Sequence, residues 1–450
     1  MNKKRWALLV FCIALIVGYI KLFYKTWNIN VVAKNADCIV AIDVKRITNT
    51  VIWNIITTPS QWKSGNVFSG SKKKQISWKD MIEVPDYILP FHISGQPANT
   101  WFVVLKIKDD NDFNAGLTVY HFEKLNSNEY VSDELGIRFF RNGEQVLVTQ
   151  QRADTTNYLA VVANELFTEK AYVEKKKLEK AIAAKSHLAV YIAANNFLQE
   201  AAVIKANFDK KKIEITSTLI PARKYGFTEN IFLYSPNSLF TGGFTQPSSS
   251  VYNLLTDSTK NHISKAVGFN IDSLLLPDNK YYALDIESIK SRIDSAITYT
   301  YDDDFNKVEK KVVNNIQEPA FNFYASGENA KTFYTYCLHN NKIEQTDSKQ
   351  FFTGIPFVKS YFDTTIFKGL NITSANYILP KTESKFAGIL FLNLSLSKIP
   401  ADLFKYFPDD ATKVLSNIES IQLEANKKDQ QLIINFFMQK KKNDLPVIKL

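Results

Sequence analysis

The chain has 450 residues, of which 45% are hydrophobic and 13% aromatic, and its formal net charge is +10. This length predicts more than one domain, and the apolar content excludes a wholly disordered chain. Five positive charges lie in the first 25 residues, which contain no acid, and this leaves +5 for the other 425 residues. So small a surplus does not predict a nucleic-acid partner.

The N-terminus combines a basic start, Met-Asn-Lys-Lys-Arg, with an uninterrupted apolar run from Trp6 to Ile20. A lysine near a helix end can reach the headgroups, so Lys21 lets the run extend to Tyr24. Nineteen helical residues from Trp6 to Tyr24 span roughly 28 Å, which is close to the hydrocarbon thickness of a bilayer. The run therefore predicts a transmembrane helix. Its apolar residues would be Trp6, Leu8, Leu9, Val10, Phe11, Ile13, Leu15, Ile16, Val17 and Ile20.

A cleaved signal peptide and a lipoprotein anchor on Cys12 are the alternatives to an uncleaved helix. The first is disfavoured because no small-x-small cleavage site follows the apolar run. The second is disfavoured because Phe11 precedes Cys12, where a small residue is expected. The basic start favours a cytoplasmic N-terminus and an exported remainder. We therefore predict a single-pass protein of the bacterial inner membrane that faces the periplasm, with residues 1–25 as cytoplasmic tip and anchor.

The segment after the predicted anchor begins with an alternating strand and an amphipathic helix, at 35–56. A polar stretch rich in Ser, Gly and Lys follows at 57–80 and predicts a surface loop. Asn142-Gly143 predicts the turn of a hairpin. Further strands are predicted at 99–107 and 143–150, and helices at 157–167 and 171–184.

Two pairs of segments share one order of predicted elements. Residues 185–220 and 385–438 each contain a strand, a short helix and a hairpin with a lysine-rich turn. Residues 101–117 and 321–337 each contain a strand that runs into a polar helix start. The similarity lies in the pattern, since few residues are identical.

We therefore predict an α+β fold: an N-terminal transmembrane helix followed by two similar antiparallel-sheet-plus-helix halves. The first exported half would comprise residues 26–228 and the second residues 229–450. The halves would meet around 221–250, where the sequence TGGFTQPSSS indicates a flexible joint.

The first strand after the predicted anchor carries a pattern of the form xADxxVxIDxxxL. The matching residues are Ala36, Asp37, Val40, Ile42 and Asp43, with Ile47 in the last position. With this pattern and its repeated αβ units, the chain resembles a loose class of uncharacterised single-span bacterial envelope proteins. Lys34 and Asn35 stand where that class often has a proline before the alanine. The resemblance implies an envelope location and no assigned activity.

Patterns that could carry catalysis or bind a metal are incomplete. Residues 65–72 invert the lysine and hydroxyl of a phosphate-binding loop and follow no buried strand. The acidic segments that begin at Asp110 and Asp302 lack the glycine and the closing glutamate of a calcium loop. The five histidines are scattered, and Ser-Leu-Ser-Lys at 395–398 has no Lys-Thr-Gly partner motif. We expect no catalytic residues, no metal and no cofactor, which favours a non-enzymatic protein.

The two cysteines beyond the predicted anchor are Cys38 and Cys337. Cys38 shares a strand face with Val40 and Ile42, and Cys337 lies near Phe333 on one helical face. Two buried thiols are favoured over a disulfide, although the pairing remains an alternative because sequence does not fix the geometry.

The aromatic run at 351–367 predicts a buried core, with a hydrophobic or sugar-binding groove as the alternative. Such a groove would be lined by Phe351, Phe352, Phe357, Tyr361 and Phe362. The tri-lysine runs, among them 210–212, predict solvated turns, with contact to anionic lipid headgroups as the alternative.

The sequence thus favours a membrane-anchored envelope protein that serves as a non-catalytic interaction or scaffolding module. Its partners would be the lipid bilayer, through the N-terminal helix, and an envelope protein. A binding module for a hydrophobic or glycan ligand is the first alternative, and an envelope hydrolase is the second.

Overall fold

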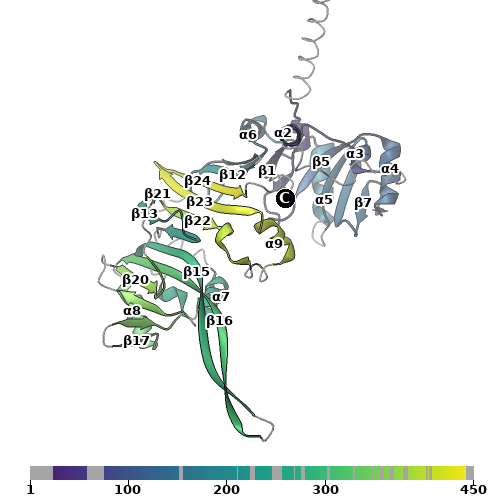
Figure 1. Ribbon diagram of the computed structural model, residues 1–450. Coiled ribbons are helices and arrows are strands. Elements are labelled where there is room, and N and C mark those ends of the chain that lie inside the picture. Colours follow the sequence, from purple (N-terminus) through teal and green to yellow (C-terminus); the bar gives the residue numbers. More distant parts are fainter. Residues whose placement is uncertain are drawn as a thin grey trace, which may run out of the picture. The chain divides into compact units, whose positions relative to one another are not determined.

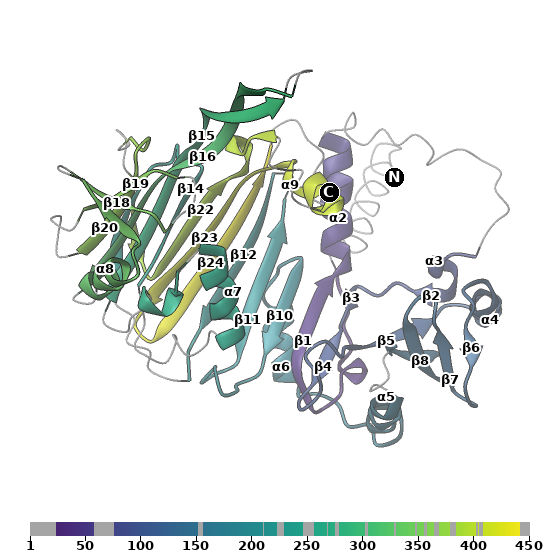
Figure 2. The same cartoon turned by 90° about the horizontal axis from the view of Figure 1, so that it is seen from below.

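The chain folds into two compact units, one running up to Ala222 and the other from Arg223 to Asn443. Both are built mainly from antiparallel β-sheet (Figures 1 and 2). The computed structural model describes residues 24–441 apart from gaps at 58–75, 152–155, 210, 223–228, 246–255, 268, 275–278, 302–304, 328–329, 347–348, 355–357, 364–368, 379–383, 402–403 and 405–407.

The predicted α+β fold with an N-terminal transmembrane helix is wrong. Strands account for 47% and helices for 24% of the structure. No helix within the described ranges is long and apolar enough to cross a membrane. The run from Trp6 to Ile20, on which the anchor was placed, lies outside those ranges. The predicted single-pass topology and the predicted inner-membrane location both depended on a helix formed by that run. Both predictions are therefore corrected together with the transmembrane helix.

The first unit is organised around β1, which is hydrogen-bonded to strands on both sides. Its antiparallel order is β12-β11-β10-β1-β4-β5-β9-β8-β7-β6. The strands are β1 (Ala36–Asp43), β2 (Ile82–Glu83), β3 (Tyr87–Ile88), β4 (Phe91–Ile93), β5 (Phe102–Ile107), β6 (Glu123–Lys124), β7 (Glu129–Ser132), β8 (Ile137–Asn142), β9 (Gln145–Gln150), β10 (Leu188–Ile192), β11 (Ala202–Phe208) and β12 (Lys212–Leu219). The helices are α2 (Val44–Thr57), α3 (Trp78–Met81), α4 (Asp110–Val119), α5 (Thr156–Ala163) and α6 (Lys175–Ile182).

The inward face of β1 carries Ile39 and Ala41, which are buried in the core beneath α5 and α6. Period-2 alternation therefore fixes which side of the strand faces the core. Cys38 lies on the other face and is half-buried, so the predicted burial of that face is not complete. A second core of the same unit packs α4 against β8 and β9, with Phe113 and Phe139 in contact edge to face.

The second unit repeats this order of pairings. Its antiparallel order is β24-β23-β22-β14-β15-β16-β20-β19-β18-β17. The strands are β13 (Asn230–Tyr234), β14 (Phe240–Phe244), β15 (Asn279–Tyr301), β16 (Lys307–Gly327), β17 (Ile343–Gln345), β18 (Gln350–Phe352), β19 (Ser360–Asp363), β20 (Gly369–Ser374), β21 (Ser384–Gly388), β22 (Leu390–Ser395), β23 (Ile418–Lys428) and β24 (Gln431–Lys440). The helices are α7 (Asp257–Val267), α8 (Ala330–His339) and α9 (Asp409–Leu415).

The two units differ most in one connection. In the first unit β4 and β5 are joined by the short segment 94–101, whereas β15 and β16 continue far beyond their sheet as a twisted two-stranded ribbon (Figure 1). We call this ribbon, residues 288–320, the arm. Part of the predicted flexible joint also has another structure, because residues 241–244 belong to β14.

Candidate functional site

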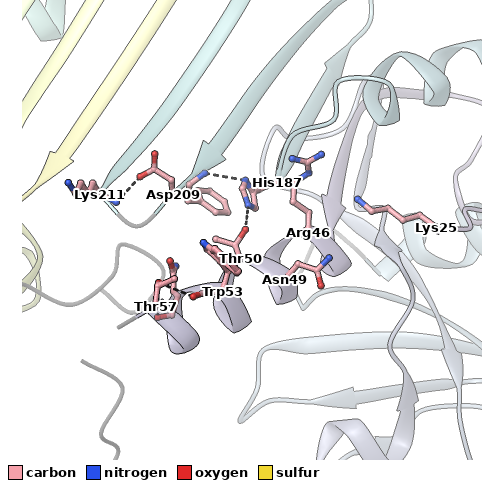
Figure 3. A pocket seen from close by; sticks show the side chains of 11 residues that line it. Lys25, Arg46, Asn49, Thr50, Trp53, Thr57, His187, Asp209 and Lys211 are labelled. Carbon is pink, nitrogen blue, oxygen red and sulfur yellow. Dashed lines mark hydrogen bonds between the residues drawn. The ribbon is translucent and has the colours of Figure 1, made fainter. Parts of the chain in front are cut away.

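A pocket of about 720 Å³ lies beside α2 in the first unit (Figure 3). Its walls are α2, the residue before β10 and the turn that joins β11 to β12. The ionisable side chains that line it are Lys25, Arg46, His187, Asp209 and Lys211. These residues are far apart in the sequence, so the fold alone brings them together.

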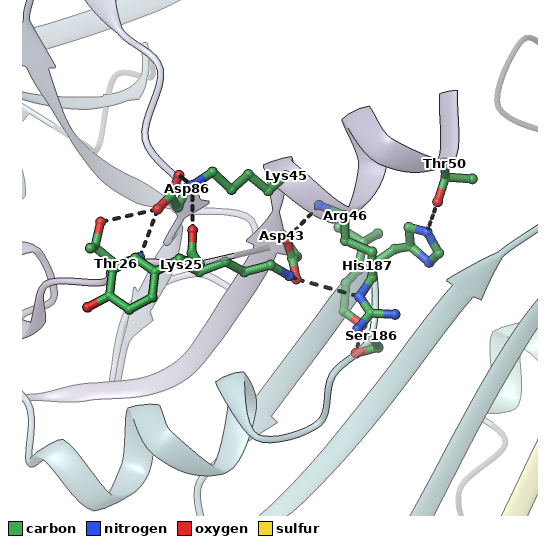
Figure 4. A network of polar contacts seen from close by, with 11 residues as sticks. Lys25, Thr26, Asp43, Lys45, Arg46, Thr50, Asp86, Ser186 and His187 are labelled. Atoms are coloured by element: carbon green, nitrogen blue, oxygen red, sulfur yellow. Dashed lines mark hydrogen bonds and ion pairs between the residues drawn. The ribbon is translucent and has the colours of Figure 1, made fainter. Parts of the chain in front are cut away.

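The start of α2 is organised around Asp43, the last residue of β1. Its Oδ1 accepts the backbone N–H of Arg46 at 2.8 Å, which caps the helix. Its Oδ2 forms ion pairs with Lys25 Nζ and with Arg46 Nε, the latter at 3.6 Å (Figure 4). The Asp43 side chain is buried, and a buried carboxylate is tolerated only when charges of this kind compensate it.

Arg46 is only partly neutralised by this arrangement. Its Nε is buried without a hydrogen-bond partner, since 3.6 Å to Asp43 exceeds hydrogen-bond distance. Asp43 meanwhile divides its charge between Arg46 and Lys25. Both cations line the pocket, which therefore keeps a positive potential on the side of α2.

A second carboxylate positions Lys25. Asp86 accepts the backbone N–H of Thr26 at 2.7 Å and pairs with Lys45 of α2 at 3.0 Å (Figure 4). Burial alone would raise the pKa of Asp86, but the Thr26 N–H and the Lys45 ammonium together hold that pKa below its ordinary value. Asp86 thereby ties the segment that carries Lys25 to the first turn of α2.

His187 lies in the wall with both ring nitrogens engaged. Nδ1 accepts the backbone N–H of Phe208 at 3.2 Å, and Nε2 lies 2.7 Å from the Thr50 hydroxyl oxygen. Because Nδ1 is an acceptor, the proton of the neutral ring is on Nε2 and is donated to Thr50. Burial, with Arg46 and Lys25 adding to it, lowers the pKa of His187 against the opposing effects of Asn207 and Asp43.

This tautomer decides what Thr50 and His187 can do chemically. A histidine that activates a hydroxyl must accept its proton, and here Nε2 already carries one. The other tautomer would direct two donors at each other, Nδ1–H and the Phe208 N–H. The pair therefore has the geometry of a structural hydrogen bond rather than of a nucleophile and its base.

The turn between β11 and β12 places the third cation. Asp209 Oδ1 accepts the backbone N–H groups of Lys211 and Lys212, at 2.7 and 2.8 Å. The carboxylate thus folds the turn and leaves the Lys211 side chain on the pocket wall. Among the described residues the lining contains three cations and one acid, and an oxygen of that acid accepts two backbone N–H groups.

Aromatic surface completes the pocket. The Phe208 ring lies against His187 with centroids 4.8 Å apart. Trp53 of α2 is 66% exposed although it lines the cavity. Asn49 and Thr57 add polar side chains along the same helix. Cationic, aromatic and neutral polar groups thus line one pocket, with Lys211 and Lys25 at opposite ends of the row of side chains in Figure 3.

The predicted aromatic groove residues lie in the second unit. Phe352 and Phe362 are buried in its core, with ring centroids 5.0 Å apart. Phe351 and Tyr361 face each other across β18 and β19 and are half-buried, and Phe357 lies outside the described residues. The structure therefore places two of the five in the core and two on the opposite face of the strands.

The incomplete motifs have structural explanations where they are described. Asp109 caps α4 by accepting the N–H groups of Asn111 and Asp112, both at 2.9 Å. Lys398 donates its Nζ to the Asn237 carbonyl rather than to Ser395. No cluster of three metal-ligating side chains occurs in the described part of the chain. The phosphate-loop-like residues 65–72 and the acids 302–304 fall in the gaps.

Sequence reasoning did not identify the pocket. In the sequence, Asp43 belongs to a strand pattern, His187 is one of five scattered histidines and Lys211 belongs to a lysine run. One local signal was available, because an aspartate between an alternating strand and a helical pattern is typical of an N-cap. The pairing of β1 with β10, which carries His187 to α2, is not encoded locally.

Comparison with known proteins adds no assignment. No family model matches the chain, and neither the curated proteins nor the solved structures yield a match. The resemblance suggested by the first strand therefore stays a prediction, and the geometry of the pocket is the basis on which a function can be proposed.

Proposed function

We propose that this protein is a non-catalytic binding module and that the pocket beside α2 binds a small ligand with an anionic group. The sequence favoured a hydrophobic or glycan ligand as an alternative function. The proposal restricts that class to ligands that also carry a negative charge. We further propose that the protein has no catalytic residues, needs no cofactor or metal, and does not bind nucleic acid.

The distribution of charge in the pocket carries the proposal. Lys25, Arg46 and Lys211 line one cavity, and Asp209, the only acid among the described residues of its lining, accepts two backbone N–H groups. A carboxylate, phosphate or sulfate group would meet an excess of positive charge, since the three cations outnumber Asp209 and the Asp43 carboxylate that pairs with Lys25 and Arg46. The exposed Trp53 ring offers the remainder of the ligand an apolar surface.

The orientation of His187 supports binding over catalysis. Its Nε2–H is donated to Thr50 and its Nδ1 accepts from Phe208, so the ring cannot take a proton from a substrate without losing a contact. Both contacts fix the wall of the pocket instead. A preformed wall lowers the entropy cost of binding.

Isothermal titration of the full chain with phenyl phosphate tests the proposal, because this probe joins an anion to an aromatic ring. We expect saturable binding that Lys211→Gln weakens about tenfold, the loss typical of one hydrogen bond to a charged group. Lys205→Gln is the matched control, since Lys205 is an exposed lysine on β11 that does not line the pocket. Its affinity should equal that of the wild-type chain.

Benzyl alcohol, which keeps the ring and lacks the charge, separates the two parts of the ligand. We expect it to bind far more weakly than phenyl phosphate. Equal binding of the neutral probe, or an unchanged affinity after Lys211→Gln, would contradict an anion site in this pocket.

An interaction module for a protein partner is the second candidate function. The observation that favours it is the exposed apolar surface near the end of α2, formed by Ile52, Trp53, Ile55 and Ile56. A crosslinked pull-down of wild-type and Ile56→Asp chains tests it. A stoichiometric partner that only the wild-type chain retains would support it, and identical sets of captured proteins would oppose it.

A further inference from the structure

The arm leaves its sheet without any accompanying strand. β15 pairs with β14 only as far as Ile286, and β16 pairs with β20 only from Asn322 onward. Between these limits each strand is paired with the other and with no further strand among those described. An isolated two-stranded ribbon is marginally stable in water, and its outer edges present unpaired backbone groups.

One face of the arm carries exposed apolar side chains among polar ones. Ile293 is 75% exposed and Ile297 61%, and their spacing places them on the same face of β15. Val313, opposite Ser295 in the register, is 60% exposed on that face. Apolar surface so exposed on a narrow ribbon is typical of an interface.

The sequence of the β15 edge is self-complementary. It reads Ile-Lys-Ser-Arg-Ile-Asp-Ser-Ala-Ile from Ile289 to Ile297. Counting outward from Ile293, three of the four pairs of residues on the two sides match: opposite charges come first, then serines, and isoleucines at the ends. The third pair outward, Lys290 and Ala296, does not match. An antiparallel partner of the same sequence would therefore place isoleucines opposite isoleucines and serines opposite serines on the face of Ile293. On the other face it would place Arg292 opposite Asp294 and Lys290 opposite Ala296.

We propose that the β15 edge of the arm pairs antiparallel with the same edge of a second copy of this chain, with the two-fold axis at Ile293. This register places Arg292 opposite Asp294 of the second copy, and symmetry repeats the pair. It also places each Ile289 opposite an Ile297. Arg292 is held on the arm by Glu318, whose Oε2 lies 3.1 Å from its Nε.

The charges also select this register over its neighbours. If one strand slips by two residues relative to the other, the same faces still meet. Such a slip would place Arg292 opposite Arg292 in one direction, or Asp294 opposite Asp294 in the other. Like charges directly opposite each other destabilise a strand pair. The slip that faces Arg292 with Arg292 also faces Lys290 with Asp294, but of the three registers only the proposed one has no like charges directly opposite each other.

Disulfide trapping tests the position of the axis. In the full chain with its native cysteines replaced by alanine, we expect Ile293→Cys to give a covalent dimer on mild oxidation. Tyr299→Cys is the matched control, because Tyr299 is also exposed and lies on the same face of the same strand. Its two copies would stand roughly 40 Å apart along the paired strands, so it should give none. Equal crosslinking of the two variants, or none from Ile293→Cys, would overturn the proposal.

A charge swap tests the register. We expect Arg292→Asp and Asp294→Arg each to weaken dimerisation about tenfold in sedimentation equilibrium, and the double variant to restore it. A chain that remains monomeric at every concentration would overturn the proposal, as would a double variant no better than either single one. Neither result bears on the pocket beside α2, which lies in the other unit.

Discussion

His187 shows how a buried histidine can be fixed in its neutral form by its neighbours. Its Nδ1 faces a backbone N–H, so a second proton would create a clash between two donors. Burial and the nearby cations Arg46 and Lys25 oppose the charged ring as well, and together they lower its pKa. At neutral pH the ring therefore acts as a fixed support for Thr50.

This state predicts a pH dependence of stability. Because the pKa of His187 is lower in the folded chain than its ordinary value of 6.5, the unfolded chain binds more protons below that pH. The contribution of His187 to the free energy of unfolding is therefore complete above pH 6.5 and decreases as the pH falls toward 5. Urea unfolding at pH 7, 6 and 5 measures it.

His187→Gln provides the comparison. Its free energy of unfolding should be lower than that of the wild-type chain at pH 7, and the difference should shrink as the pH is lowered to 5. A difference that stays constant between pH 7 and pH 5 would show that the ring is not held neutral by its surroundings.

Among the elements, the arm is the one whose removal we expect to cost the unit least. No strand other than β15 and β16 pairs with it among those described, and its large side chains, such as Ile293 and Ile297, are exposed. Replacing residues 291–317 by Asn-Gly would join Lys290 to Glu318 through a two-residue hairpin turn. The resulting connection would resemble the short one between β4 and β5.

We predict that this shortening changes the melting temperature by less than about 3 °C, which corresponds to about 1 kcal/mol for a unit of this size. Differential scanning calorimetry measures the change. A much larger fall would mean that the arm supports the fold of its own unit, contrary to the pairings described above.

Local elements could be predicted where the sequence carries a local signal. The strand and helix expected at 35–56 are confirmed as β1 and α2, and the hairpin at Asn142-Gly143 is confirmed, with Gly143 at a φ of 58°. The length of β15 was not predictable, because residues 291–300 alternate weakly and those whose burial is described are exposed. Strand pairing decides such cases, and pairing is not local.

The two units of the molecule share the same order of strand pairings, but different residues occupy the equivalent positions. β14 takes the central position that β1 takes in the first unit. It includes Gly242 and Gly243, which the composition had assigned to a flexible joint. A Cβ on Gly243 would lie 2.5 Å from the Phe232 ring and 2.9 Å from the Tyr282 carbonyl oxygen. Close packing, not flexibility, requires this glycine.

We predict that Gly243→Ala destabilises the second unit by about 3 kcal/mol, since a buried ring and a backbone carbonyl must both move. Gly242→Ala is the matched control, because its nearest neighbour is the edge of the Phe240 ring, at 2.8 Å, and its nearest backbone atom is at 3.6 Å. It should cost less. Hydrogen exchange should show faster exchange in β14 and β15 of the Gly243 variant and unchanged exchange in β1 and β10. Equal costs for the two variants would contradict this explanation.

The fold class and the pocket were beyond sequence reasoning for one physical reason. Hydropathy along the first residues predicted an anchor, yet it says nothing about which strands pair, and the pairings make this a β-sheet protein. The pocket likewise needs Lys25, Arg46 and Lys211, which come together only when β1, β10, β11 and β12 form one sheet. A site formed by residues that long-range strand pairing brings together gives little signal in any single segment of the sequence.

A crystal structure of the full chain with phenyl phosphate would show directly whether the pocket beside α2 is an anion site. We expect the phosphate group in that pocket, within hydrogen-bond distance of the Lys211 Nζ, and the ring against Trp53. A crystal in which the pocket stays empty at saturating probe, or in which the phosphate binds only elsewhere, would contradict it.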